Sequence, residues 1–212
     1  MSNTGKVATS GFIAGQIAEQ INAVAGSPPS PPMPQSTGAQ QAIIQQGIVL
    51  RRYVELSSLL EAQKMVSQEL GLSESMSLTN FVMRAAAKAL KQSNFSLTGD
   101  IALVDISEAT VRLKPIQAAT QLDFMQLLQA IEAARVKDSA QADLLVADLS
   151  SYHVDEVMFG SNVPVLALGR IVNDDKSSLS TLSFSGTLPA REASNFLARV
   201  AKLLNEPVRL FV

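Results

Sequence analysis

The chain has 212 residues, and its 47% hydrophobic content is enough for one domain with a sizeable core. Only 17% of the residues are charged, the net charge is −2, and no basic patch occurs, so composition argues against a nucleic-acid partner. Cysteine is absent, which excludes disulfides, thiol nucleophiles and cysteine-bound zinc. No apolar run is long enough to span a bilayer, so we expect no membrane partner. The low charge content indicates a surface partly covered by another subunit, or simply one rich in Ser, Gln and Asn.

The first 46 residues are expected to form two segments. Residues 1–26 contain a predicted first core helix, because four apolar residues recur at helical spacing: Ile13, Ile17, Ile21 and Val24. Residues 27–46 begin with a proline-rich stretch that excludes helix and strand interiors, so they are expected to form a strap or linker. The start of the sequence shows no hydrophobic signal region and no Arg-rich presequence. The chain is therefore either cytosolic or a mature or trimmed part of something longer.

Residues 47–212 are expected to form the core domain. Apolar and β-branched runs predict strands at 48–56, 100–106, 109–116, 142–150, 163–172 and 177–185. Helical periodicity predicts helices at 57–71, 77–94, 122–138 and 190–206. Two of the strand runs are unbroken and apolar, which is typical of central strands buried on both faces. This order predicts an α/β sandwich with one mixed sheet.

Local patterns add detail to two of these helices. Ser58 and Glu61 have the spacing of a capping box at the start of the helix at 57–71, and Gly71 is placed to end it. In the helix at 77–94, four apolar residues share one face, and a run of alanines predicts close packing on a sheet: Leu78, Val82, Ala86 and Leu90.

The search for chemistry finds no nucleotide-binding, nucleophile-elbow or zinc-protease motif. The single histidine, His153, has a side chain suited to general base catalysis, and Asp155 and Glu156 follow it. A histidine at the edge of a loop beside two acids is the simpler interpretation. Asp174 and Asp175 sit in a polar turn without further ligands, so we expect a solvated hairpin and no metal site.

Four stretches in chain order resemble the core domain of the 2-oxoacid dehydrogenase acyltransferases (E2), which has the chloramphenicol-acetyltransferase fold. They are residues 9–21, residues 53–69 with 76–97, residues 163–171 and residues 181–207. In the second stretch, "LTNFVMRAAAKAL" is similar to the family's L-S-V-N-D-F-I-I-K-A-A-A-x-A-L. In the fourth, "TLSFSGTLPARE" stands where the family reads T-L-S-x-D-H-R-x-x-D-G-A. The resemblance implies this fold and a homotrimer.

The last match places the family's catalytic motif at the junction of a strand and a helix. With one residue deleted, its positions are occupied here by Ser185, Gly186, Thr187, Pro189 or Ala190, and Arg191. The family's histidine takes a proton from the thiol of coenzyme A or dihydrolipoamide, and its place falls on Gly186, which has no side chain. The resemblance therefore implies an acyltransferase fold without its catalytic histidine and aspartate.

A core domain without this base resembles the non-catalytic E3-binding proteins of the pyruvate dehydrogenase complex, in their shortened fungal form. That resemblance implies a structural role in which this domain joins the E2 acetyltransferase core. Upstream modules, among them a lipoyl domain not present in this chain, would hold dihydrolipoamide dehydrogenase (E3). It implies no cofactor in this domain and a location in the mitochondrial matrix. The apolar tail residues Leu210, Phe211 and Val212 are then candidates for docking onto another trimer; a terminal strand folded on its own subunit is the alternative.

Two other functions stay open. One is a working or residual dihydrolipoamide acyltransferase whose rewired site uses His153 as its base. The other is a binding module whose empty pocket holds a ligand similar to coenzyme A.

Overall fold

The computed structural model describes residues 47–69, 71, 76–93, 98–107, 110–152, 154–157, 162–174 and 177–212. The chain divides into two compact units, residues 1–43 and 44–212, and every described residue belongs to the second. The helix expected within residues 1–26 and the strap at 27–46 lie outside the described residues.

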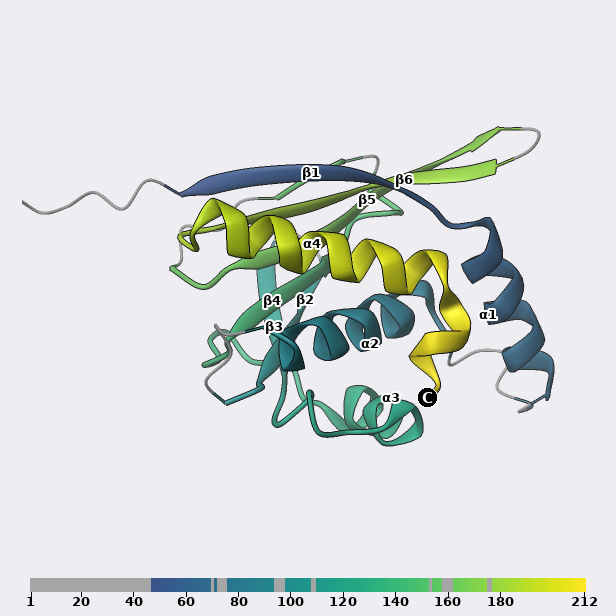
Figure 1. Cartoon of the computed structure of the whole chain (residues 1–212). Helices are drawn as coiled ribbons and strands as arrows, with labels where there is room; N and C mark the ends of the chain where they lie inside the picture. The colour runs from purple at the N-terminus through teal and green to yellow at the C-terminus, as the bar shows by residue number, and fades with distance from the viewer. Residues whose placement is uncertain are drawn as a thin grey trace, which may run out of the picture. The chain divides into compact units, whose positions relative to one another are not determined.

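The second unit is built on one six-stranded sheet in the order β1-β6-β5-β4-β2-β3 (Figure 1). The strands are β1 (Ile48–Glu55), β2 (Ile101–Ser107), β3 (Thr110–Ile116), β4 (Leu144–Asp148), β5 (Val165–Asp174) and β6 (Ser177–Gly186). β4 is parallel to both β2 and β5, whereas the pairs β1–β6, β5–β6 and β2–β3 are antiparallel. The predicted mixed sheet is confirmed.

The two apolar runs form β4 and the first half of β5, and they lie inside the sheet as predicted. Alternate residues of both strands enter different hydrophobic clusters. Leu144, Val146 and Leu166 join the large cluster that contains the helices, while Leu145 and Ala167 join a smaller cluster on the opposite face. A strand whose two faces both meet apolar neighbours needs no polar alternation, which explains the continuous pattern.

Four helices cover one face of the sheet (Figure 1). They are α1 (Ser57–Glu69), α2 (Leu78–Lys91), α3 (Phe124–Ala133) and α4 (Ala190–Asn205). The opposite face is covered in part by connecting segments, whose residues Ala140, Ala142, Val157 and Val163 pack against the smaller cluster.

Past the last β1–β6 pair, Glu55 with Leu179, the hairpin of β5 and β6 continues through the pairs Asn173–Ser178 and Asp174–Ser177 and projects beyond β1 as a short arm (Figure 1).

Helix α2 is buried almost all round. Eleven of its 14 residues are buried, not only the predicted stripe, because α2 packs between the sheet and the other helices. Its run Ala85–Ala87 is fully buried, which fits the close packing that the alanines predicted. The predicted apolar stripe covers fewer residues than are buried, because a helix covered on several sides has no solvent-exposed polar face that would mark the limits of the stripe.

Two basic residues of α2 hold the C-terminal turn, the 3₁₀ helix η1 (Pro207–Leu210). Arg84 is buried; its Nε donates to the Leu210 carbonyl at 3.0 Å, and its Nη1 donates to the Leu122 carbonyl. Lys88 donates to the backbone oxygens of Arg209 and Val212. Burial lowers the pKa of Arg84 and, with help from neighbouring Arg84 and Lys91, that of Lys88.

The C-terminal tail is therefore neither a strand nor a free plug. Leu210 is fully buried in the core of its own chain, so it is not exposed for docking. The Phe211 ring packs edge-on against Phe124, with the ring centroids 4.7 Å apart, and near Phe81 at 6.1 Å. Phe211, which is 38% exposed, and Val212, which is 90% exposed, remain available to a neighbour.

The predicted capping box of α1 is wrong. Ser58 is already the second residue of the helix, so its side chain does not cap the start. The Glu55 carboxylate instead accepts a hydrogen bond from the Ser57 amide at 2.7 Å, and hydrogen bonds from Ser57 lower the pKa of Glu55. Gly71 follows with φ +64°, in agreement with its predicted place after the helix.

Replacing Glu55 with Gln should lower the free energy of unfolding by about 0.5–1 kcal/mol at pH 7, because a carboxylate at a helix start is lost. Since the folded chain lowers the pKa of Glu55, its contribution is present above the unfolded pKa of about 4.3 and disappears as the pH falls through the folded value. Urea titrations of both proteins across pH 7 to 3 should therefore converge in acid. The matched control is Glu61→Gln, which changes the exposed acid of the wrong capping box and should have no effect.

Replacing Leu210 with Ala should lower the free energy of unfolding by about 2–4 kcal/mol, because it leaves a cavity in the core. Val212→Ala, two residues further on, should change it by less than about 0.5 kcal/mol. Denaturant unfolding measures both variants. Equal stability of the two would mean that the tail does not pack as described.

Candidate functional site

The turn between β6 and α4 is the position at which the resemblance places catalysis. β6 ends at Gly186, and α4 begins at Ala190 after Pro189, whose extended backbone precedes the first turn without a side-chain cap. Gly186 pairs with Ile48 of β1, so the end of β6 is held inside the sheet. Leu188 packs against the large cluster. The turn is thus fixed by the strand on one side and by core packing on the other.

Gly186 leaves little room for a side chain. A Cβ at this position would lie 3.0 Å from the Pro164 Cβ and 3.1 Å from the Pro164 Cα. A proline ring cannot swing aside as a flexible side chain can, because it is closed onto the backbone. A side chain at residue 186 would therefore require Pro164 to shift by a few tenths of an ångström.

The rest of the turn offers no base suited to a thiol. Its polar side chains are the hydroxyls of Ser185 and Thr187 and the exposed guanidinium of Arg191. A hydroxyl needs a base of its own before it reacts, and arginine stays protonated. Glu192 is an exposed carboxylate in the first turn of α4.

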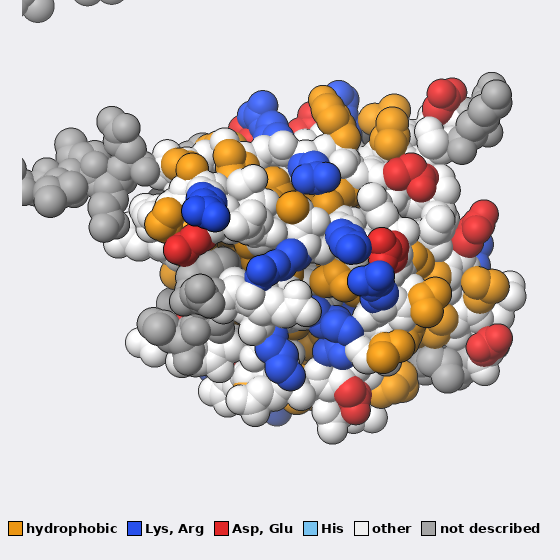
Figure 2. Space-filling view, in the orientation of Figure 1, with side chains coloured by type: hydrophobic (Ala, Val, Ile, Leu, Met, Phe, Trp, Pro, Cys, Tyr) orange, Lys and Arg blue, Asp and Glu red, His pale blue; other side chains and the backbone are white. Residues whose placement is uncertain are grey.

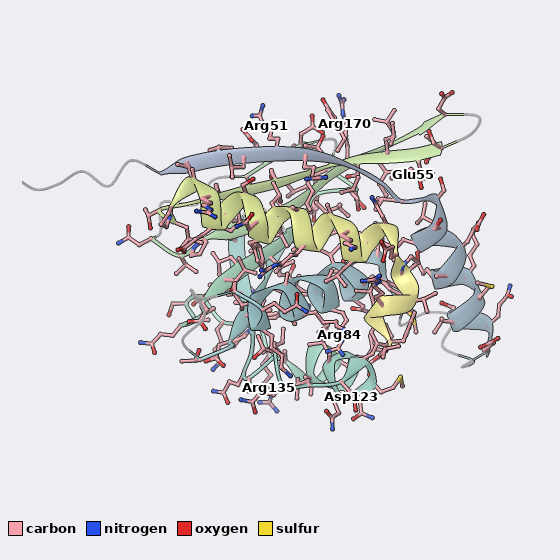
Figure 3. The ribbon with its side chains drawn as sticks, viewed as in Figure 1. Arg51, Glu55, Arg84, Asp123, Arg135 and Arg170 are labelled. Atoms are coloured by element: carbon pink, nitrogen blue, oxygen red, sulfur yellow. The ribbon has the colours of Figure 1, made fainter. Side chains whose placement is uncertain are left out.

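His153 itself lies outside the described residues, but the two acids that follow it are both engaged elsewhere. Asp155 faces Arg170 at 3.4 Å. Glu156 accepts two hydrogen bonds from Arg51, at 2.7 and 2.5 Å, and this contact lowers the pKa of Glu156 and raises that of Arg51. Figure 3 shows Arg51 and Arg170 projecting from the sheet on the side away from the helices.

These ion pairs belong to a crossing segment that the sequence did not reveal. Residues 154–157 run across β5, where the Arg170 amide donates to the Val154 carbonyl at 3.0 Å. A Cβ at Gly169 would lie 2.8 Å from the Asp155 Cα, so only glycine permits the crossing. The glycine of the "GRI" string is the one signal in the sequence that could have indicated it, because glycine within a strand often marks a close backbone approach.

Beside this crossing lies an open hollow of about 360 Å³ on the sheet face away from the helices. Its lining residues are Arg51, Arg52, Tyr53, Val154, Asp155, Glu156 and Thr181. Its two carboxylates are each paired with an arginine, Glu156 with Arg51 and Asp155 with Arg170, so neither of these described lining residues is a free base.

Asp174 ends β5, and Asp175 lies outside the described residues. Within the described ranges, no group of three or more His, Cys, Asp or Glu residues is placed to hold a metal. Among the same residues, no helix combines the length and apolar character needed to cross a membrane.

No protein-family model matches the chain, and no curated protein matches it. Solved structures do. A probable dihydrolipoamide acetyltransferase from Listeria monocytogenes superposes with a TM-score of 0.62 at 15% identity, over 76% of this chain and 85% of that one. Chloramphenicol acetyltransferase superposes with a TM-score of 0.53 at 13% identity, over 74% and 88%. The chain has the chloramphenicol-acetyltransferase fold.

A third solved structure shares the fold. Dihydrolipoamide acetyltransferase from Azotobacter vinelandii superposes with a TM-score of 0.62 at 16% identity, over 78% of this chain and 84% of that one. The roles of a serine, a histidine and an asparagine in its catalytic mechanism have been investigated. At such identities the likeness shows the fold alone.

Replacing Gly186 with Ala should lower the free energy of unfolding by about 1–3 kcal/mol, because the new methyl group overpacks against Pro164. Thr187→Ala, at the exposed next position, should cost less than about 0.5 kcal/mol. Thermal and urea unfolding compare the two. A neutral Gly186→Ala variant would show that the position has space for a side chain.

Proposed function

We propose that this chain is a non-catalytic structural core component of the pyruvate dehydrogenase complex. It anchors dihydrolipoamide dehydrogenase (E3) to the E2 assembly through oligomerisation of the acyltransferase-like domain. The observation that supports the proposal is the turn at Gly186, where the resemblance places the catalytic histidine and where an added Cβ would lie 3.0 Å from the Pro164 Cβ. Loss of a general base lowers a rate by about 10²–10⁴.

The intact fold supports a structural role. Buried residues of all four helices join those of the sheet in one large hydrophobic cluster, so the domain has the packed core that a structural role needs. A domain that binds neighbours needs its surface and its stability, not a base. The low share of charged residues, 17%, fits a surface that is partly covered by other subunits, and we propose a homotrimer.

Within this proposal the chain resembles protein X, the E3-binding protein, in its fungal form. Modules expected upstream, with their lipoyl group, would then be tethered to the E2 core in the mitochondrial matrix. Tethering raises the local concentration of dihydrolipoamide dehydrogenase next to the lipoyl groups and needs no new chemistry.

The test is acetyl transfer from acetyl-CoA to dihydrolipoamide, with an active E2 core as the positive control. We expect no turnover above background for the purified chain and none for His153→Ala. Turnover that is lost in His153→Ala would establish the rewired acyltransferase instead. Tight binding of coenzyme A in calorimetry would establish the ligand-binding module.

The anchoring role is tested separately by light scattering of the domain alone and mixed with an E2 core. We expect the mass of a trimer alone and co-migration with the core in the mixture. A monomer that leaves the E2 core unchanged would contradict the proposal.

A further inference from the structure

The two edge strands of the sheet, β3 and β1, differ in whether their outward backbone groups already have hydrogen-bond partners. At the β3 edge, Leu113 exchanges two backbone hydrogen bonds with Lys137, both at 2.8 Å, and Pro115 has no amide hydrogen to offer. Such features prevent the addition of another strand. The β3 edge is therefore closed to pairing.

The β1 edge is open. The Leu56 amide donates to the Ser178 carbonyl, and these two residues would be the next pair in the β1–β6 register. In an antiparallel ladder, pairs that exchange hydrogen bonds alternate with pairs that do not. The even-numbered residues of β1 therefore bond to β6, while Val49, Arg51 and Tyr53 direct their amide and carbonyl groups outward. No backbone hydrogen bond to another described residue occupies these outward groups. β1 has eight residues and no proline, so each outward residue has an amide to donate.

Exposed apolar side chains accompany this open edge. Val49 is 39% exposed and Tyr53 is 79% exposed, an unusual exposure for an aromatic residue in a strand. Tyr53 also lines a second hollow with Val172 and Leu179, which are themselves exposed. The edge thus presents hydrogen-bonding groups and apolar surface together, as a partner strand requires.

We propose that β1 pairs with β1 of a second copy of this chain, antiparallel and about a twofold axis at Arg51. Arg51 lies at the middle of β1, so a twofold axis there places each of the three outward residues opposite an outward residue of the partner strand. Val49 lies opposite the partner's Tyr53, Arg51 opposite the partner's Arg51, and Tyr53 opposite the partner's Val49. Three pairs that exchange two hydrogen bonds each give six bonds across the contact.

The side chains of β1 favour a second copy over an unrelated strand. Each Val49–Tyr53 pair joins a β-branched residue to an aromatic one, a favourable combination across strands that the twofold axis creates twice. Two arginines face each other at the centre, but Glu156 binds each of them through two hydrogen bonds. The four charges therefore alternate in sign, and the surface is complementary to itself.

This contact goes beyond the proposed anchoring function and does not depend on whether the chain catalyses acyl transfer. A trimer that also carries a twofold edge on each subunit would assemble into a larger body.

The absence of cysteine from the sequence allows a direct test. In the proposed register, the two copies of residue 51 have Cα atoms about 5.5 Å apart, within disulfide range. The two copies of residue 49 lie about 14 Å apart along the strands. Under mild oxidation, Arg51→Cys should form disulfide-linked dimers on non-reducing gels, and Val49→Cys should not. The double variant Val49→Cys/Tyr53→Cys should form them again.

A proline variant tests the same contact without oxidation. Val49→Pro removes an outward amide hydrogen and should keep the fold, as judged by circular dichroism. In ultracentrifugation, this variant should need at least a tenfold higher protein concentration than the unchanged chain to associate. Leu50→Pro, whose amide faces β6, should unfold the chain and so confirms the direction of the ladder.

Absence of crosslinking in Arg51→Cys together with unchanged association of Val49→Pro would overturn the twofold contact. Crosslinking of Val49→Cys or Tyr53→Cys alone would overturn its register. Neither result touches the acetyl-transfer assay, so the two proposals can fail independently.

Discussion

The burial of α2 is the constraint on which the rest of this domain depends. An alanine-rich helix can lie close to the sheet because its side chains are short, and the remaining helices then close over it. Arg84 is the polar exception within this packing. It is held by the carbonyls of Leu122 and Leu210, so one buried cation joins the entry to α3 and the C-terminal turn to the central helix. Removing it would leave both acceptors without this donor in a site with little access to water.

A basic face surrounds this buried arginine at the surface. Figure 2 shows Lys and Arg side chains gathered over the helical layer, although the chain as a whole carries a net charge of −2. Arg199 of α4 donates to the Gln92 carbonyl just after α2, and Lys88 reaches the backbone of the tail. These cations therefore satisfy backbone carbonyls at element ends, which is a structural use of charge.

The fold was largely predictable because its strongest signals are local. Continuous apolar runs indicated β4 and β5, and strict helical spacing indicated α2 and α4. The sequence-based predictions were wrong or incomplete where the structure depends on contacts between residues that no short motif links. The α1 start depends on Glu55 rather than on Ser58, and the crossing of residues 154–157 over Gly169 joins segments that no short motif connects. For the site, the resemblance implied a glycine in place of the catalytic histidine, which stays a prediction; the coordinates add that Pro164 lies close to where a Cβ at residue 186 would be.

The arm formed by the outer parts of β5 and β6 has a consequence for the motion of the domain. Past the last β1–β6 pair, the ladder between Asn173–Asp174 and Ser177–Ser178 has no third strand among the described residues, and only Ser178 is also bonded to Leu56 and Ser57. Two-stranded ribbons without a third strand or a covering layer are marginally stable in water. Amide protons of this arm should therefore exchange with solvent long before those of the central strands, which makes it the first part of the sheet to open.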